Sequence, residues 1–418
     1  MIIIGAKALE IGVVMRTLLK KMLPHWLLTI LKKIRYVWIV SLFHIFRLVP
    51  IRKDKIVLCN VWGFGDNAKY VTEELARRKI DIEERKNLID PFHIYFITNH
   101  PKSAHAPEGV KVLKTNSISA VFALATAKVW VDNNRKESYI RKRKGQYYIQ
   151  TWHGGIALKK IEKDYEEKLG QTYVENAKRD SKMTDLYISN SNFCTNMYRN
   201  SFWYDGEILE CGSPRNDILL QPNTSLNREI KSRLNMDQSV NIALYAPTYR
   251  EGNDTKPYSI DYHQLLHVLE EKFSGNWILA VRLHPLVSEQ SNAFTYDNQI
   301  INASHYRDIY ELMAVSDILI TDYSNIMFEF SFMKKPVFLY ALDEAEYTKD
   351  RGFYFDYNSL PFMKANSEEE LFQHIRNYSP DEDQEKVQEF LNTLEIYETG
   401  EASKKVVDRI LDVINLSS

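Results

Sequence analysis

The chain has 418 residues and a formal net charge of −1, with 44% hydrophobic and 26% charged residues. This composition is typical of a packed globular protein and excludes a disordered chain, and the neutral total gives no reason to expect nucleic-acid binding. The length predicts two domains of about 150–200 residues each. Three widely spaced cysteines exclude a disulfide framework and a CxxC metal site, and they indicate a reducing compartment.

The start of the chain differs from the rest in charge. Between Ile11 and Lys53 there are nine Lys or Arg residues and no acidic residue, interleaved with aromatic and aliphatic side chains. The longest uncharged run, YVWIVSLFHIF, has 11 residues, well short of the ~20 that span a bilayer. It also lacks the cleavage site of a secretory signal. We therefore expect residues 11–53 to lie on an anionic membrane surface, with helices packed on the protein body as the alternative.

After residue 54, apolar strand-like runs alternate with helical patterns, which predicts parallel α/β layers. The expected strands of the first half are 56–62, 93–98, 128–133, 147–152, 185–191 and 208–213, with a helix at 68–78. In the second half we expect strands at 241–247, 276–285, 317–324 and 336–343 and helices at 263–273, 308–316 and 325–335. The polar segment QPNTSLNR (221–228) predicts the boundary between them.

This pattern predicts an α/β chain with three parts: residues 1–53, 54–222 and 229–418. The last two would be Rossmann-like domains that face each other, with the active site in the cleft between them. Polar residues at the carboxyl ends of the predicted strands would then line this cleft, because open parallel sheets bind ligands there.

The run QYYIQTWHGGIALKKI places His153, Gly154 and Gly155 at the end of a predicted strand. Glycines at such a point let the backbone turn sharply and approach a ligand. A tight turn with an incidental histidine is the alternative interpretation.

Two further segments, CGSPRND and YAPTYR, also follow predicted strands. Arg215 would project from the first turn of the next element, where a guanidinium can clamp a phosphate. The alternative is a helix start capped by Asn216 and Asp217. Thr248 and the amides beside it could hold a base or a phosphate, although such a segment alone is more often a turn.

The segments RLHP and TDYSNIMFE are more specific. Arg282 and His284 alternate along a predicted strand and would share one face, which indicates that they bind an anion or transfer a proton. The alternative is that the histidine has a structural role. In the other segment we expect an exposed Asp322, then Ser324 and Asn325 at a helix start that could bind phosphate or simply cap the helix. One turn into that helix, Glu329 could accept hydrogen bonds from ribose or glycerol hydroxyls.

The sequence lacks the motifs of several other classes of enzyme. The chain has no GxxxxGK[ST], no HExxH and no clustered Cys and His, and GFGDNA does not complete GxGxxG. The remaining features together predict a pocket for a nucleotide-activated donor with a histidine base. Fixed cations could replace a metal there, and Mg²⁺ is left open. The basic run RKESYIRKRK (135–144) would follow a polyanionic acceptor or lipid headgroups, or form a solvated loop.

TWHG, GSPRND, APTYR, RLHP and TDYSNIMFEFSFMKKPVFLY, in this order, resemble the CDP-glycerol glycerophosphotransferase family, whose members build teichoic acid and related poly(glycerol-phosphate) chains. The resemblance covers roughly residues 55–400. It implies a GT-B architecture, CDP-glycerol as donor, a lipid-linked or polymeric acceptor in wall or capsule synthesis, and a peripheral place on the cytoplasmic face of the membrane. It leaves open the acceptor, the number of units added and the oligomeric state.

By motif, His153 resembles the family's general base and His284 its second essential histidine, near the donor pyrophosphate. Matching positions imply that the CDP-glycerol pocket is lined by Gly154, Gly155, Ile156, Ala157, Arg215, Pro247, Thr248, Arg282, Leu283, Ser324, Asn325 and Glu329. The chain departs from the family where HGTP reads HGGI and where Glu329 replaces an aspartate. Ribitol phosphate is therefore an alternative to glycerol phosphate, and a GT-B glycosyltransferase or an inactive membrane scaffold are further alternatives.

Overall fold

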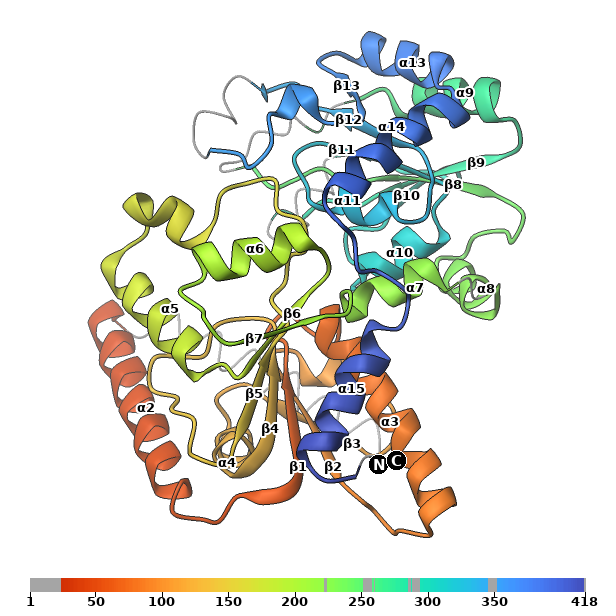
Figure 1. Ribbon diagram of the computed structural model, residues 1–418. Helices are drawn as coiled ribbons and strands as arrows, with labels where there is room; N and C mark the ends of the chain where they lie inside the picture. The colour runs from red at the N-terminus through yellow and green to blue at the C-terminus, as the bar shows by residue number, and fades with distance from the viewer. Residues whose placement is uncertain are drawn as a thin grey trace.

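A computed structural model describes residues 24–221, 224–250, 258, 260–284, 287, 294–344 and 352–416. Figure 1 shows two α/β units, one above the other, each built around its own sheet. The predictions for residues 1–23 lie outside the described residues.

The first unit contains a seven-stranded, all-parallel sheet in the order β3-β2-β1-β4-β5-β6-β7. Its strands are β1 (Arg52–Cys59), β2 (His93–Thr98), β3 (Val110–Lys114), β4 (Ala127–Asp132), β5 (Tyr147–Gln150), β6 (Leu186–Ser189) and β7 (Glu207–Glu210). Its helices are α2 (His25–Phe46), α3 (Asp66–Lys86), α4 (Ile118–Thr126), α5 (Gln171–Met183) and α6 (Asn192–Ser201). The carboxyl-terminal part of β1 and most of β4 and β5 are buried, because helices cover both faces of the sheet.

The second unit contains a six-stranded parallel sheet in the order β10-β9-β8-β11-β12-β13. Its strands are β8 (Asn241–Tyr245), β9 (Trp277–Val281), β10 (Ile300–Asn302), β11 (Ile318–Thr321), β12 (Val337–Tyr340) and β13 (Met363–Ala365). Its helices include α7 (Asp217–Leu220), α8 (Thr224–Arg233), α9 (Tyr262–Phe273), α10 (Ile309–Val315), α11 (Ile326–Ser331), α13 (Glu368–Asn377) and α14 (Pro380–Thr393). The prediction of an α/β chain with two Rossmann-like units is confirmed.

The division between the units differs in detail from the predicted boundaries. The polar segment 221–228 contains the start of α8, whose Leu226 and Ile230 pack on the core one turn apart. The last helix, α15 (Ala402–Val413), returns to the first unit and packs beside α3, as Figure 1 shows. Its Val406 and Ile410 share a hydrophobic cluster with Leu75. The end of the chain therefore stabilises the first unit, although its sequence position suggested the second.

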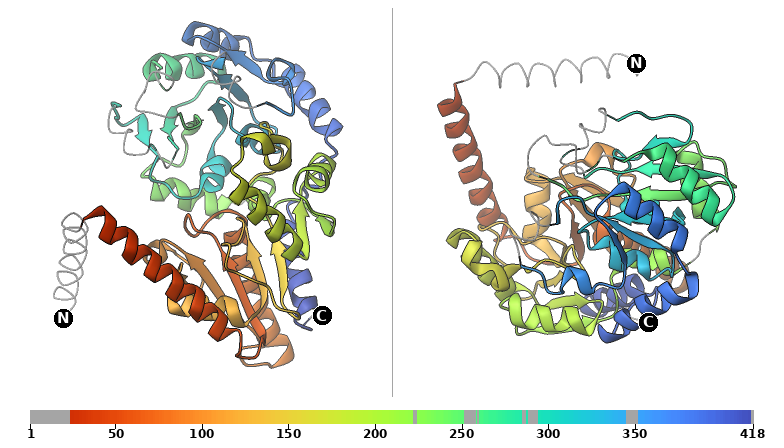
Figure 2. Two further views of the ribbon diagram at one scale, coloured as in Figure 1. Left: turned by 90° about the vertical axis from the view of Figure 1, so that its left-hand side faces the viewer. Right: turned by 90° about the horizontal axis from the view of Figure 1, so that it is seen from above.

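Helix α2 lies along the outer edge of the first unit (Figure 2). It packs against α4 through Ile39 and Phe43, which are 5% and 1% exposed, and through an edge-to-face contact between Phe46 and Phe122. Other large hydrophobic side chains of α2 remain exposed, among them Trp26, Ile30, Ile34, Val37 and Trp38. Within the described ranges, no helix is long and apolar enough to cross a membrane.

Candidate active site

The histidine loop follows β5 at the carboxyl edge of the first sheet. Trp152 adopts a left-handed backbone conformation (φ 55°), which is costly for a residue other than glycine and is held here by packing. Its ring is 7% exposed, meets Phe202 edge to face at 4.9 Å and lies 5.5 Å from the Arg135 guanidinium. The His153 ring stacks on Trp152 at 4.4 Å and itself remains exposed. A rigid indole thus supports an accessible imidazole.

A single hydrogen bond orients the His153 ring. Its Nδ1 lies 2.8 Å from the main-chain oxygen of Asn133. A carbonyl oxygen can only accept, so Nδ1 must carry the proton, and in the neutral ring the lone pair is on Nε2. We find no second polar partner of this ring among the described residues. Nε2 is therefore the ring nitrogen that can accept a proton.

The two glycines after His153 differ in what they allow. A Cβ on Gly155 would lie 2.5 Å from Nδ2 of Asn190, so this glycine is required by packing within the protein. The nearest atom to a Cβ on Gly154 would be 3.7 Å away, which is ordinary contact. Ile156 is only 1% exposed, and its side chain belongs to the core.

A pocket of about 240 Å³ opens beside the histidine and is lined by both units. The first unit contributes Trp152, His153, Gly154, Gly155, Ala157, Lys159 and Ile161, and the second contributes Tyr323 and Asn325. Across the junction the amide of Leu158 donates to Oδ1 of Asn325 at 3.0 Å. Asn325, predicted to bind a ligand, therefore also joins the two units at the start of α11, next to Ser324.

Arg215 lies in an ion-pair network between the two units. It is 4% exposed, and its terminal nitrogens donate to Asp66 at 2.9 Å and to Glu329 at 2.6 Å. Burial opposes its charge, but Glu329, Tyr310 and Asp66 together raise the pKa of Arg215 well above its ordinary value. Glu329 also accepts from the Tyr310 hydroxyl at 2.7 Å. Arg215 and Glu329 were both predicted to contact the ligand. In the structure they bind each other and neighbouring protein groups instead.

Asp322 is buried, at 1% exposure, and not exposed as predicted. Strands β8 and β11 are neighbours, so their carboxyl ends meet and bring Asp322 to Thr248. The carboxylate accepts from the Thr248 amide at 2.9 Å and hydroxyl at 3.0 Å, and pairs with Arg250 at 2.8 Å. The hydroxyl of Thr248 is therefore held by the protein, and Pro247 beside it is buried.

Arg282 and His284 follow β9, which ends at Val281, so they lie on a loop and not on the strand as predicted. Arg282 is half-buried, has no ion pair within the described ranges, and burial lowers its pKa to about 10. Burial and the nearby Arg282 charge also lower the pKa of His284, which favours its neutral form. Leu283 between them is fully buried. The Asp308 carboxylate partly offsets the effect of burial on Arg282 but is itself paired with Lys69. A desolvated cation that makes no ion pair in the described part of the chain is suited to an anionic ligand.

Neither Arg282 nor His284 lines the pocket around His153. The structure places them at the carboxyl edge of the second sheet, while His153 is at that of the first. Among the described residues, no group of three or more His, Cys, Asp or Glu could hold a metal ion.

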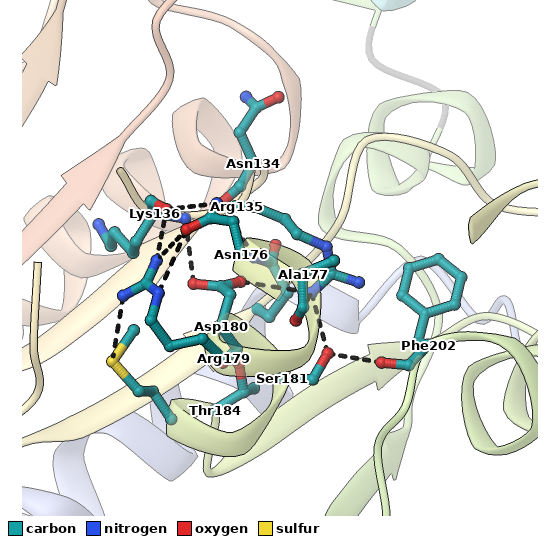
Figure 3. A network of polar contacts seen from close by, with 12 residues as sticks. Asn134, Arg135, Lys136, Asn176, Ala177, Arg179, Asp180, Ser181, Thr184 and Phe202 are labelled. Carbon is teal, nitrogen blue, oxygen red and sulfur yellow. Dashed lines mark hydrogen bonds and ion pairs between the residues drawn. The ribbon is translucent and has the colours of Figure 1, made fainter. Parts of the chain in front are cut away.

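The basic run 135–144 is partly internal, with Arg141 and Lys144 exposed. Arg135 pairs with Glu162 at 2.7 Å, and the fully desolvated Lys136 pairs with Asp132 at 2.7 Å. Figure 3 shows Asp180 and Ser181 of α5 reaching this segment. Most basic side chains of this run therefore stabilise the first unit beneath the histidine loop. They were predicted to follow an acceptor or to form a solvated loop.

Two Rossmann-like units with an oriented histidine in a pocket at their junction define a protein of the GT-B-like fold class. Residues 41–412 match the family model described as CDP-glycerol:poly(glycerophosphate) glycerophosphotransferase. The chain therefore belongs to this family, and it is a glycerophosphotransferase.

Named relatives agree with this assignment. A teichoic acid poly(glycerol phosphate) polymerase of Bacillus spizizenii is 32% identical over 386 residues, covering 88% of this chain and 95% of the relative. The chain spans 50% of the corresponding Bacillus subtilis polymerase, at 32% identity over 88% of this chain. A structure of the wall teichoic acid polymerase TagF, soaked with CDPG, has a TM-score of 0.78 at 28% identity and covers 93% of this chain and 97% of its own. Relatives named as ribitol-phosphate polymerases are 25–27% identical, which favours the glycerol-phosphate reading.

Proposed function

We propose that the chain transfers glycerol phosphate from CDP-glycerol to a hydroxyl of a lipid-linked or polymeric acceptor, with His153 as the general base. The observation that carries this role is the hydrogen bond from Nδ1 to Asn133, which leaves Nε2 as the basic nitrogen of an exposed ring. The ring also lines a pocket to which both units contribute.

In the proposed reaction Nε2 of His153 takes the proton of the acceptor hydroxyl. The acceptor oxygen attacks the β-phosphorus of CDP-glycerol and forms a new P–O bond. The bond from this phosphorus to the bridging oxygen breaks, and CMP leaves with that oxygen. The glycerol phosphate is thereby joined to the acceptor by a phosphodiester.

On the donor side, Arg282 would stabilise charge on the pyrophosphate, because it makes no ion pair within the described ranges and the carboxylate that acts on its charge, Asp308, is itself paired with Lys69. His284 would act beside it as a neutral hydrogen-bonding group. The remaining donor-site positions would be the loop from Gly154 to Ala157 and Pro247, Thr248, Leu283, Ser324 and Asn325. At Ile156 and Leu283 the side chain is buried, so the main chain would make the contact. Arg215 and Glu329 would support this site through their mutual ion pair.

We further propose that α2 holds the enzyme on the cytoplasmic face of the membrane. Its exposed hydrophobic side chains are accompanied by Lys32, Lys33 and Arg35, which suit an anionic surface. This position would bring the cleft to a lipid-linked acceptor in the synthesis of teichoic acid or a capsule polymer.

The first test compares wild type, His153→Ala and the control His263→Ala with CDP-glycerol and a lipid-linked acceptor series. His263 is an exposed histidine on α9 of the other unit. Loss of a positioned base should slow CMP release about 10²–10⁴-fold in His153→Ala, without a change in melting temperature. The control should react like wild type. Near-normal CMP release by folded His153→Ala would reject the base role, and a parallel reaction with CDP-ribitol tests the donor.

A further inference from the structure

Behind the His153 ring, Asn133 is held at both ends of its side chain. Asn133 directly follows β4 and is fully buried. Its Nδ2 donates to Oδ2 of Asp66 at 2.7 Å, and its Oδ1 accepts from Asn134 at 2.7 Å. Because its main-chain oxygen is the one that accepts from His153, anything that fixes Asn133 also fixes the imidazole.

Asp66 connects this support to the second unit. It begins α3 in a left-handed conformation (φ 55°), and its Oδ1 accepts from the Asn67 amide at 2.7 Å and from Arg215 at 2.9 Å. Burial would raise the pKa of Asp66, but the Arg215 charge and these hydrogen bonds lower it overall, so the carboxylate stays ionised. Arg215 in turn pairs with Glu329 of α11.

We propose that Asn133 and Asp66 are positioning residues that hold the base with its proton on Nδ1, and that Arg215 couples this arrangement to the second unit. The inference rests on the proposed base role of His153 and adds the residues that orient it. Neither Asn133 nor Asp66 lines the pocket around His153, so neither is expected to contact the reacting atoms. Disturbing the support should therefore change turnover more than donor binding.

The structure suggests a reciprocal exchange as the test. In Asn133→Asp two carboxylates would face each other without a donor between them. In Asp66→Asn one acceptor oxygen would remain where there were two, so either Asn133 or Arg215 would face a donor instead of an acceptor. The double variant Asn133→Asp/Asp66→Asn restores one donor and one acceptor, and it keeps acceptors for Asn134 and Arg215. Asn116→Asp is the matched control, because the Asn116 side chain accepts from the Tyr139 hydroxyl, donates to no described residue, and keeps an acceptor after the change.

Misplacement of a reacting group by about 1 Å can cost ~10²-fold, so we expect Asn133→Asp to lower kcat about 10- to 100-fold. KM for CDP-glycerol should stay within about threefold, since the change removes no ground-state contact with the donor. The double variant should recover most of the lost kcat, and the control should match wild type. A double variant as slow as Asn133→Asp, or normal turnover in both single variants, would overturn the inference.

A second measurement separates this inference from the proposed function. The ¹⁵N shifts of His153, assigned by difference from His153→Ala, report which ring nitrogen carries the proton without any substrate. We expect protonated Nδ1 in wild type and in the double variant, and loss of this preference in Asn133→Asp. A proton on Nε2 in the neutral wild-type ring would overturn the inference even if CMP is released. Protonated Nδ1 without CMP release would instead reject the proposed function.

Discussion

Two arginines that look equivalent in the sequence have different surroundings in the fold. Both Arg215 and Arg282 follow a strand in the sequence, and both were predicted to bind phosphate. Arg215 is paired with Asp66 and Glu329, whereas Arg282 is half-buried with no ion pair in the described part of the chain. The first arginine should therefore matter to folding and the second to the ligand.

The variants Arg215→Gln and Arg282→Gln should separate these roles. Removing Arg215 leaves the buried Glu329 and the half-buried Asp66 without their partner, which should cost about 3–5 kcal/mol of unfolding free energy. Removing Arg282 should leave stability unchanged or slightly higher, while kcat/KM for CDP-glycerol falls about 10- to 100-fold, the worth of a charge-assisted hydrogen bond. Urea unfolding and steady-state kinetics check both. Equal stability losses in the two variants would contradict the assignment.

At the scale of elements, α2 combines the two interpretations open from its sequence. One side packs on α4 through Ile39 and Phe43, as a helix docked on the protein body would. Its other large hydrophobic side chains face outward together with its basic residues. The packed side fixes the helix, and the outward side is left for a surface such as a membrane.

Substituting outward side chains of α2 should weaken membrane binding without loss of folding. We expect the triple variant Ile30→Ser/Ile34→Ser/Trp38→Ser to float less with anionic liposomes than wild type, because its apolar contact with the bilayer is reduced. The control is Ile80→Ser/Ile118→Ser, two side chains that are each 56% exposed on α3 and α4. Equal flotation of all three proteins would reject a membrane role for this helix.

At the scale of the whole molecule, the chain crosses between the units a second time before α15. In this connection the half-buried Glu398 accepts from the Ser213 amide at 3.1 Å and from Asn216 at 2.6 Å. Desolvation raises the pKa of Glu398 to about 8, from an ordinary value of 4.5. The folded protein therefore binds a proton here that the unfolded chain releases near pH 4.5.

This raised pKa gives stability a definite pH dependence. The contribution of Glu398 is complete below about pH 4.5 and is lost as pH rises towards about 8, because only the folded state retains the proton in that interval. Glu398→Gln should flatten the decline of melting temperature between these limits. The exposed Glu385→Gln, in α14, should leave the decline unchanged. An identical slope in Glu398→Gln and wild type would contradict the assignment.

Much of the fold could be predicted because buried parallel strands are nearly continuous apolar runs. The strands that prediction missed are β3, β10 and β13, all at sheet edges, with the sequences VKVLK, IIN and MKA. They are short or only half-buried, so their side chains carry no long apolar signal. Likewise, α15 is amphipathic, but nothing local says which unit its apolar side covers.

By itself the sequence determined the α/β class, the family and the placement of His153 just after a strand, because these depend on local pattern and motif order. Tertiary structure alone decided which charged side chains are paired. Arg215 finds Asp66 across 149 positions and Glu329 across 114, and no local pattern encodes such distant partners. The same holds for the support of His153, which depends on the neighbouring ends of β4 and β5 and on the start of α3.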